Sequence, residues 1–332
     1  MEEPSQITQK ITILKIKKPQ NTHKKSEKIE EKTQKMAKSK YEYVKQFESS
    51  TIALPQTYMV VRLDGRGFTK MCDLHKFEKP NDLKALEVMN QAAKDVLSNF
   101  HDIFIAYGQS DEFSFAFTKD SDLFERRTDK IVSCLVSLFT ASYCMNFEKI
   151  YGKPLKTIPS FDGRLVCYPS EAVLVDYFSW RQVDCHINNM YNTCFWLLVK
   201  SGIENKKAEE MLKGTLSSDK NELMFTKFGI NYNKVEPRFR KGSIVMRVWR
   251  ADEDKVRKYE QILAAGGVVK KSDGTEVVVK PPRKKQRVVE SFEDLIKPRF
   301  WVENFGGDFR LLLKDSKAKG KGEGIKEEIK EN

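Results

Sequence analysis

Tyr58-Met59-Val60-Val61-Arg62-Leu63 is an apolar run that ends at Asp64 and Gly65. Its Val and aromatic residues favour a β-strand, and the glycine after the acid leaves its backbone carbonyl unobstructed. A second acid, Asp111, lies in the turn Tyr107-Gly108-Gln109-Ser110-Asp111-Glu112, between two further apolar runs. Carboxylate and carbonyl oxygens are the ligands that Mg²⁺ prefers. This layout predicts a metal and phosphate site at the ends of strands.

The apolar periods predict the order β-α-β-β-α-β for the central part of the chain. Pro80-Asn81-Asp82 is expected to open a helix with Asn81 as its N-cap. The strands Ile103–Tyr107 and Phe113–Phe117 are expected to form a hairpin with three phenylalanines on one face. A long helix from Leu123 to Ile150 and a strand from Arg164 to Tyr168 follow. This order is the split βαβ arrangement of ferredoxin-like sheets, so the expected fold class is α+β.

In such a sheet the end of the first strand lies beside the hairpin tip. Asp64 and Asp111 would then face each other and could hold two cations about 4 Å apart. An Asp-Gly pair alone is usually only a turn, but the second acid at the hairpin tip favours a metal site. Glu112 points to the opposite strand face from Asp111. It is expected either to support the site or to pair with a nearby Arg or Lys.

Basic and hydroxyl side chains near the acids suit the oxygens of a triphosphate, namely Arg62, Arg66, Lys79 and Ser110. The alternative for each is solvation at the surface. A later stretch, Trp180–Asn192, is rich in amides and aromatic residues. At helical spacing Asp184, Asn188, Tyr191 and Asn192 share a face that suits nucleobase edges and stacking. The alternative is a helix end with polar contacts to its neighbours.

The chain has 332 residues and a formal net charge of +12, which favours a polyanionic partner such as nucleic acid. Solvation by charged tails explains part of this excess. The six cysteines show no Cys-x-x-Cys pair and no zinc spacing, so we expect reduced thiols. No apolar run approaches the length of about 18 residues that a spanning helix needs, and no secretory signal is recognisable. A cytoplasmic or nuclear location is therefore expected, without a membrane.

Three regions are expected from the composition. Residues 1–35 carry nine lysines and five glutamates with few aromatic residues, and they should be disordered. Residues 36–250 form the folded domain. Residues 251–332 form a charged region with a short docking segment near 290–305. Its basic cluster, Lys280–Arg287, is either a nuclear address or a solvated linker.

Several stretches together resemble the tRNA-histidine guanylyltransferase family. They are Met36–Val44, Val61–Arg66, Phe77–Asp82, Ala106–Glu112, Phe161–Arg164, Tyr177–Asn192 and Gly214–Glu222. The resemblance implies a polymerase-type palm that assembles as a homotetramer and adds a guanosine to the 5′ end of tRNA(His). It also implies that ATP adenylylates the tRNA 5′-monophosphate, that the 3′-hydroxyl of GTP then attacks, and that two Mg²⁺ ions take part.

The resemblance also assigns residues. Asp64, the carbonyl of Gly65 and Asp111 would bind the two Mg²⁺ ions, with Asp64, Asp111 and Glu112 as the catalytic group. The nucleotide site would comprise Asp64, Gly65, Arg66, Gly67, Phe68, Thr69, Lys79, Ser110 and Asp111. Some relatives have a histidine where this chain has Thr69. His186, Asn188 and Lys220 match positions linked to tRNA recognition or activation.

Two other classes of function are compatible with parts of the pattern. A nucleotide cyclase shares the two-metal palm and would form a cyclic product without tRNA. A noncatalytic RNA-binding module would show no Mg²⁺-dependent chemistry, and the pair of acids argues against it. The sequence leaves open whether the enzyme adds one guanosine or also copies a template.

Overall fold

The computed structural model describes residues 39–264, 266–270, 275–283, 285–306 and 309. The predicted disordered extension, residues 1–35, lies outside the described residues. The described residues before Ser50 and those from Ser50 onward belong to two separate compact units. The first contains a short 3-10 helix, η1 (Glu42–Phe47), and the second contains all the remaining elements.

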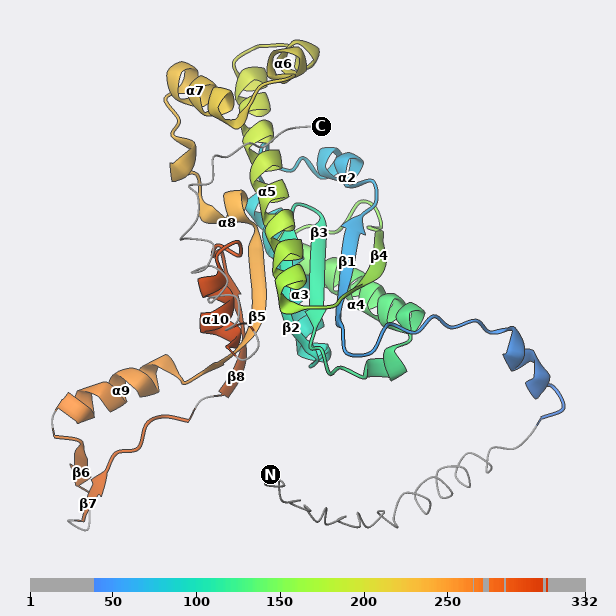
Figure 1. Cartoon of the computed structure of the whole chain (residues 1–332). Helices are drawn as coiled ribbons and strands as arrows, with labels where there is room; N and C mark the ends of the chain where they lie inside the picture. Colours follow the sequence, from blue (N-terminus) through green and yellow to red (C-terminus); the bar gives the residue numbers. More distant parts are fainter. Residues whose placement is uncertain (1–38, 265, 271–274, 284, 307–308, 310–332) are drawn as a thin grey trace, which may run out of the picture. The chain divides into compact units, whose positions relative to one another are not determined.

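The second unit is built on one antiparallel sheet with the strand order β4-β1-β3-β2-β5-β8 (Figure 1). Its strands are β1 (Tyr58–Gly65), β2 (Ile103–Gln109), β3 (Glu112–Phe117), β4 (Phe161–Tyr168), β5 (Ser243–Arg250) and β8 (Lys285–Ser291). A small separate hairpin consists of β6 (Val268–Lys270) and β7 (Glu276–Val278). The mixture of helices and antiparallel strands confirms the predicted α+β class.

Helices cover both faces of the sheet. The longer ones are α3 (Leu83–Asn99), α4 (Thr128–Tyr151) and α5 (Glu171–Lys200); the shorter ones are α2 (Phe68–His75), α6 (Asn205–Leu212), α7 (Ser217–Phe228), α8 (Pro237–Lys241), α9 (Glu253–Ala264) and α10 (Pro298–Phe305). Two 3-10 turns, η2 (Leu123–Arg126) and η3 (Tyr232–Lys234), complete the described elements. The elements from β1 to β4 therefore contain the predicted β-α-β-β-α-β order, with the short helix α2 added.

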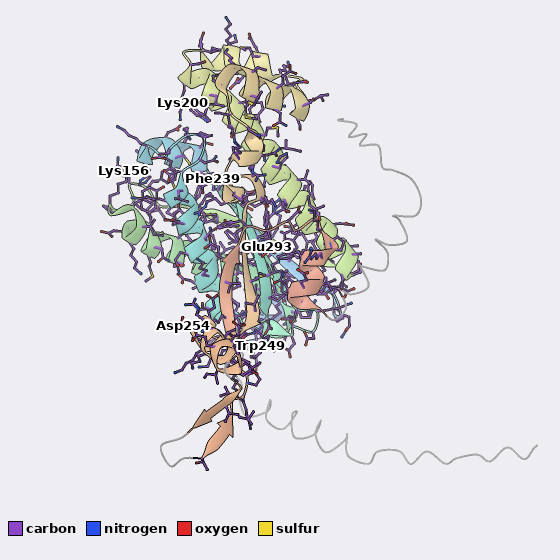
Figure 2. The ribbon with its side chains drawn as sticks, turned by 90° about the vertical axis from the view of Figure 1, so that its left-hand side faces the viewer. Lys156, Lys200, Phe239, Trp249, Asp254 and Glu293 are labelled. Carbon is purple, nitrogen blue, oxygen red and sulfur yellow. The ribbon has the colours of Figure 1, made fainter. Side chains whose placement is uncertain are left out.

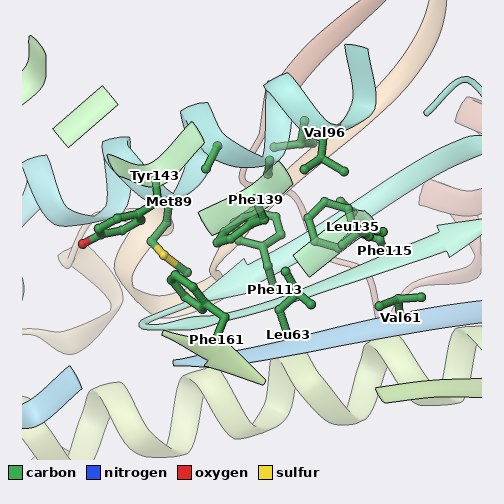
Figure 3. Close-up of a cluster of buried hydrophobic side chains, with 14 of the residues drawn as sticks. Val61, Leu63, Met89, Val96, Phe113, Phe115, Leu135, Phe139, Tyr143 and Phe161 are labelled. Carbon is green, nitrogen blue, oxygen red and sulfur yellow. The ribbon is translucent and has the colours of Figure 1, made fainter. Parts of the chain in front are cut away.

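Strand alternation divides the core between the two faces. Val61 and Leu63 of β1 pack with the phenylalanines of β3 and with α3 and α4, and Figure 3 shows this cluster. Tyr58 and Val60 of the same strand point to the other face, where they pack with α5 and with Trp301 of α10. The predicted hairpin with Phe113, Phe115 and Phe117 on one face is confirmed.

A third cluster holds the far end of α5 against α6, α7 and η3, through residues such as Leu198, Leu212 and Met224. Side chains in the middle of α5 donate hydrogen bonds to three backbone carbonyls, one of which is Lys241 O, 2.9 Å from Gln182 Nε2. Gln182 Nε2 donates to Glu293 O at 3.0 Å, and Cys185 Sγ donates to Phe239 O at 3.7 Å. Figure 2 shows Phe239 and Glu293 between Lys200 above and Trp249 below.

The structure corrects three boundaries. The N-cap of α3 is Asp82, which accepts a hydrogen bond from Ala85 N at 3.0 Å, and not Asn81. The helix expected from Leu123 begins at Thr128, because Phe124 and Glu125 have φ angles of 51° and 57°. Strand β4 begins at Phe161, three residues before the predicted start.

Within the described residues, α4 is long and apolar enough to cross a membrane by length and composition, which differs from the expectation that no run approaches this length. Its apolar residues have another explanation. Ile131, Leu135, Phe139 and Phe147 are fully buried under the sheet. Their spacing in multiples of four makes α4 a core helix that buries one face.

Candidate active site

The two predicted acids lie at the same end of the sheet. In the ladder between β1 and β3, Asp64 lies opposite Glu112, and Gly65 N donates to Asp111 O at 3.0 Å. A Cβ on Gly65 would lie 2.9 Å from Cβ of Asp111 and 2.4 Å from the Phe68 ring. Only glycine therefore fits between the two acids. The hairpin tip meets the end of β1 as the topology predicts.

Burial is the main cause of the raised pKa of the Asp111 carboxyl, and the charge of Asp64 raises it further. Hydrogen bonds from Ser110 and from the backbone of Asp111 oppose this shift. Two acids that repel each other in a partly buried place are stabilised by a cation.

The donor set at this position fits Mg²⁺. It consists of two carboxylates and the carbonyl of Gly65, which no side chain of that residue covers. Among the described residues there is no group of three or more His, Cys, Asp or Glu side chains that could hold a metal. Mg²⁺ suits such a sparse set, because it usually keeps several waters and binds through one or two carboxylates plus substrate phosphates.

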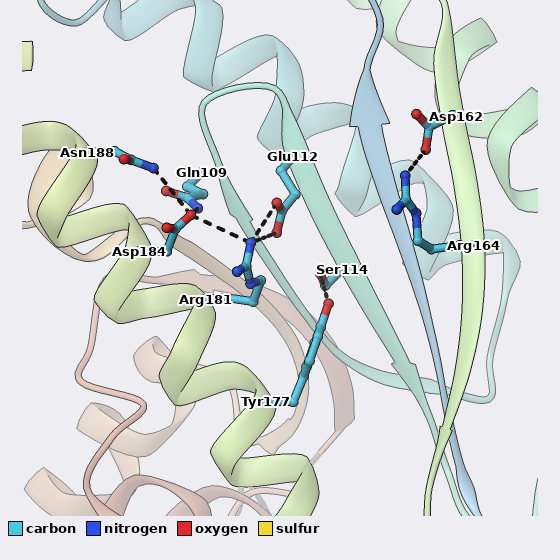
Figure 4. Close-up of polar contacts among 9 residues, drawn as sticks. All are labelled: Gln109, Glu112, Ser114, Asp162, Arg164, Tyr177, Arg181, Asp184 and Asn188. Atoms are coloured by element: carbon cyan, nitrogen blue, oxygen red, sulfur yellow. Dashed lines mark hydrogen bonds and ion pairs between the residues drawn. The ribbon is translucent and has the colours of Figure 1, made fainter. Parts of the chain in front are cut away.

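Glu112 points toward α5 and forms an ion pair there. Arg181 Nη1 lies 3.0 Å from Oε2 of Glu112, and both side chains are largely buried (Figure 4). Arg181 also lies 3.6 Å from Asp184 and stacks on Trp180, with Cζ 3.3 Å from the ring centroid. Burial raises the pKa of Glu112, while Arg181 and Arg62 oppose the shift. This is the salt bridge considered as an alternative from the sequence, and the supporting role of Glu112 stays a prediction.

A cavity of about 480 Å³ opens beside Asp111. Five residues of the predicted nucleotide site line it: Phe68, Thr69, Lys79, Ser110 and Asp111. Asp64, Gly65, Arg66 and Gly67 are not among its lining residues. They lead from β1 into α2, whose N-cap is Gly67 with a φ of 70°. The volume is in the range of small-molecule sites and suits a nucleotide.

The opposite wall of the cavity comes from α5 and α8. Asn188, Tyr191, Asn192 and Trp196 line it, together with Arg238 and Phe239. Three of the four residues predicted to share a polar face of this helix are therefore at the cavity. The fourth, Asp184, accepts hydrogen bonds from Gln109 Nε2 at 3.1 Å and Asn188 Nδ2 at 3.2 Å (Figure 4).

The three residues predicted for RNA binding are not brought together in the cavity. Asn188 lines it, whereas His186 packs edge-to-face against Tyr232 with the ring centroids 5.3 Å apart. Burial and the charge of Arg240 lower the pKa of His186. Lys220 Nζ donates to Thr215 O at 2.7 Å.

The sequence reasoning missed Trp196 and Lys200. The ammonium of Lys79 lies over the Trp196 ring at 5.7 Å from its centroid, and Lys200 Nζ donates to Lys79 O at 2.6 Å. One signal could have identified them. Asn188, Asn192, Trp196 and Lys200 recur every four residues, so they follow one side of a helix.

Comparison with known proteins shows the family to which this chain is similar. The family model described as tRNAHis guanylyltransferase matches residues 41–169, and the one described as Thg1 C terminal domain matches residues 172–297. A protein of Neurospora crassa named tRNA(His) guanylyltransferase is 51% identical over 275 residues, which are 80% of this chain and 94% of that protein. One of the same name from Schizosaccharomyces pombe is 55% identical over 213 residues, 64% of this chain and 82% of that protein.

Solved structures are similar as well. The crystal structure of the Saccharomyces cerevisiae tRNA(His) guanylyltransferase is 44% identical with a TM-score of 0.60, and the match covers 62% of this chain and 93% of that one. A bacterial protein described as Thg1-like, solved in complex with ATP, is 25% identical with a TM-score of 0.55. That match covers 63% of this chain and 88% of the bacterial chain.

Proposed function

Because the chain belongs to the tRNAHis guanylyltransferase family and is a nucleotidyltransferase, we propose that it adds a guanosine to the 5′ end of tRNA(His). In the first step the 5′-monophosphate of the tRNA attacks ATP and becomes adenylylated, and pyrophosphate leaves. In the second step the 3′-hydroxyl of GTP attacks the activated 5′-phosphate and AMP leaves. Removal of pyrophosphate from the added nucleotide completes the 3′-to-5′ addition.

One observation carries this proposal: Asp64 and Asp111 meet at the end of the sheet, and Asp111 also lines a cavity of nucleotide size. We propose that Asp64, the Gly65 carbonyl and Asp111 hold two Mg²⁺ ions, with Glu112 assisting. When bound, such ions neutralise charge on the reacting phosphate and favour ionisation of the attacking hydroxyl. The two acids themselves fix where the attacking oxygen and the phosphate meet.

The nucleotide is proposed to lie in the cavity. Lys79 and Ser110 would bind its triphosphate oxygens, Lys79 as a point charge and Ser110 through its hydroxyl. Arg66 to Thr69 would contact it from the start of α2. His186, Asn188 and Lys220 are proposed to contact the tRNA, and the position of Asn188 in the cavity wall supports its part.

We also propose that the sheet is a polymerase-type palm. The order β4-β1-β3-β2, with α3 and α4 on one face and the two acids at one end, supports this assignment.

The family resemblance supports a homotetramer, which light scattering of the purified protein would test. We propose a cytoplasmic or nuclear location, and the cluster Lys280–Arg287 would suit a nuclear address.

Guanosine transfer tests the reaction. Purified protein with tRNA(His) transcript, ATP, labelled GTP and Mg²⁺ should label the tRNA, and a tRNA with another anticodon should not be labelled. Asp111→Asn should reduce the rate by at least about a hundredfold, whereas Asp120→Asn, at an exposed acid after β3, should not. No labelling by a folded sample would contradict the proposal. A cyclic product from GTP or ATP without tRNA would favour a nucleotide cyclase instead.

A further inference from the structure

Lys79 lies on the segment between α2 and α3, and both ends of this segment are held by α3 and α4. Phe77 stacks on Tyr151 with ring centroids 5.2 Å apart. Asp82 accepts hydrogen bonds from Glu78 N at 2.9 Å, Tyr151 Oη at 2.9 Å and Ala85 N at 3.0 Å. None of these contacts involves Lys79 itself.

Lys79 is held from the other side, by the last turns of α5. Lys200 Nζ donates to Lys79 O at 2.6 Å, which fixes the backbone, and the Trp196 ring lies under the Lys79 ammonium at 5.7 Å. Trp196 and Lys200 are four residues apart and therefore share a helix face. The contact of Lys79 with Asp73 is longer, at 3.7 Å, and the Asp73 side chain is 68% exposed.

We propose that Trp196 and Lys200 are positioning residues that hold Lys79 at the cavity wall for the triphosphate of the nucleotide. This inference rests on the proposed function, which places the triphosphate at Lys79. A free lysine loses much rotamer freedom when it binds a phosphate. The aromatic face attracts the ammonium and the hydrogen bond fixes the backbone, so part of this freedom is already lost before the nucleotide arrives.

The same face of α5 connects this contact with the rest of the cavity. Asn188, Asn192 and Trp196 line the cavity at intervals of four residues, and Lys200 follows one turn later. A rise of about 1.5 Å per residue places Lys200 about 18 Å along the helix from Asn188. One rigid element thus links the residue proposed for tRNA contact with the residue proposed to bind the triphosphate.

Binding of GTP with Mg²⁺ to the full chain, measured by calorimetry without tRNA, tests the inference. Lys200→Met removes the donor but keeps most of the length of the side chain, and it should raise the Kd for GTP by about 5- to 20-fold. Lys200→Arg should restore binding to within about twofold, because it can still donate to the carbonyl. Trp196→Leu should weaken binding and Trp196→Phe should retain most of it. Lys207→Met, at an exposed lysine of α6, is the matched control and should bind GTP like the wild type.

A double variant separates positioning from general stability. Lys79→Met removes the proposed phosphate contact, and adding Lys200→Met to it should cause no further loss of GTP binding. A merely structural role would make the two losses multiply. In the transfer assay Lys200→Met should raise KM for GTP while KM for tRNA(His) stays unchanged, and thermal melting checks that each variant is folded.

The outcomes are distinguishable. If Lys79→Met weakens GTP binding but Lys200→Met does not, or if their losses multiply, the positioning role is wrong and the proposed function stands. If the wild type binds no GTP, or Lys79→Met binds like the wild type, the triphosphate assignment fails and the inference fails with it.

Discussion

Gly65 shows how a single position controls the geometry of the candidate site. It separates Asp64 from the hairpin tip, and its amide donates to the carbonyl of Asp111. Any side chain here must displace either the Phe68 ring or the Cβ of Asp111. The requirement for glycine is therefore steric, since Gly67 has a left-handed backbone and Gly65 does not.

We predict that Gly65→Ala lowers guanosine transfer by about a hundredfold, because a displacement near 1 Å at reacting groups has this cost. Overpacking should lower the free energy of unfolding by about 1–3 kcal/mol. Gly152→Ala is the matched control. Gly152 has a φ of 70° and open space around it, so alanine there should cost about 1 kcal/mol of stability and no activity. Equal activity of the two variants in the transfer assay would refute the steric role of Gly65.

His75, the last residue of α2, is fully buried and should make stability depend on pH. Its Nε2 accepts a hydrogen bond from Lys156 N at 3.2 Å, and its ring packs against Phe147. Burial, followed by the charges of Lys153 and Lys156, lowers the pKa of His75 below its ordinary value of 6.5. The unfolded chain therefore binds this proton more readily than the folded protein does.

We predict that the contribution of His75 to stability is complete above about pH 6.5 and is lost as the pH falls through that value toward the lowered folded pKa. His75→Gln keeps a hydrogen-bond acceptor for Lys156 N but cannot be protonated. Lowering the pH from about 7 to about 5 should therefore reduce the free energy of unfolding of the wild type more than that of His75→Gln. Urea titration of both proteins at each pH measures this difference. A difference that is independent of pH would show that His75 does not titrate in this way.

The residues of the site differ in how well the sequence predicts them. Asp64 and Asp111 follow from strand ends and topology, because neighbouring strands bring their ends together. The sequence predicted that Glu112 could pair with an Arg or Lys but did not identify which one, since Arg181 lies 69 positions away in sequence. Trp196 and Lys200 could not be assigned a role, because their contact with Lys79 depends on where a loop crosses a helix that begins far along the chain.

At the scale of elements, η2 shows why the start of α4 was predicted too early. Leu123 and Phe124 continue an apolar helical pattern, but Phe124, Glu125 and Arg126 all have positive φ angles of 51–59°. Tertiary contacts stabilise this turn. The buried guanidinium of Arg126 donates to the carbonyls of Ala53, Leu54, Thr57 and Ser121. Strands β1, β2 and β3, in contrast, were predicted well, because each contains a buried apolar run. Strand β8 was not predicted, because its first residues belong to the basic cluster Lys280–Arg287.

We predict that Arg126→Met lowers the free energy of unfolding by about 3 kcal/mol, because four carbonyls lose a charged donor in a place that water reaches poorly. Lys149→Met, at an exposed residue of α4, is the control and should change stability by less than about 0.5 kcal/mol. Urea unfolding followed by circular dichroism measures both. A loss below about 1 kcal/mol for Arg126→Met would mean that the turn is stable without the guanidinium.

At the scale of the whole molecule, the composition predicts a net positive charge, which no single helix or strand accounts for. The chain has 59 Lys and Arg against 47 Asp and Glu, which gives the net charge of +12. Ion pairs with acids engage some of these cations, such as Arg181 with Glu112 and Arg287 with Asp252. Exposed cations such as Lys280 and Arg283 add to a positive field that attracts phosphates without specifying a sequence.

We predict that tRNA(His) binding weakens by about 30-fold between about 50 and 200 mM KCl, as expected when roughly three phosphates release their counterions. The Asp111→Asn variant allows binding to be measured without turnover, by filter binding or fluorescence anisotropy. Lys280→Gln combined with Arg283→Gln should reduce the slope of log Kd against log salt if these cations contact the RNA, whereas GTP binding should stay unchanged. An unchanged slope would assign the tRNA contacts to cations elsewhere in the chain, and a Kd independent of salt would contradict an electrostatic partner altogether.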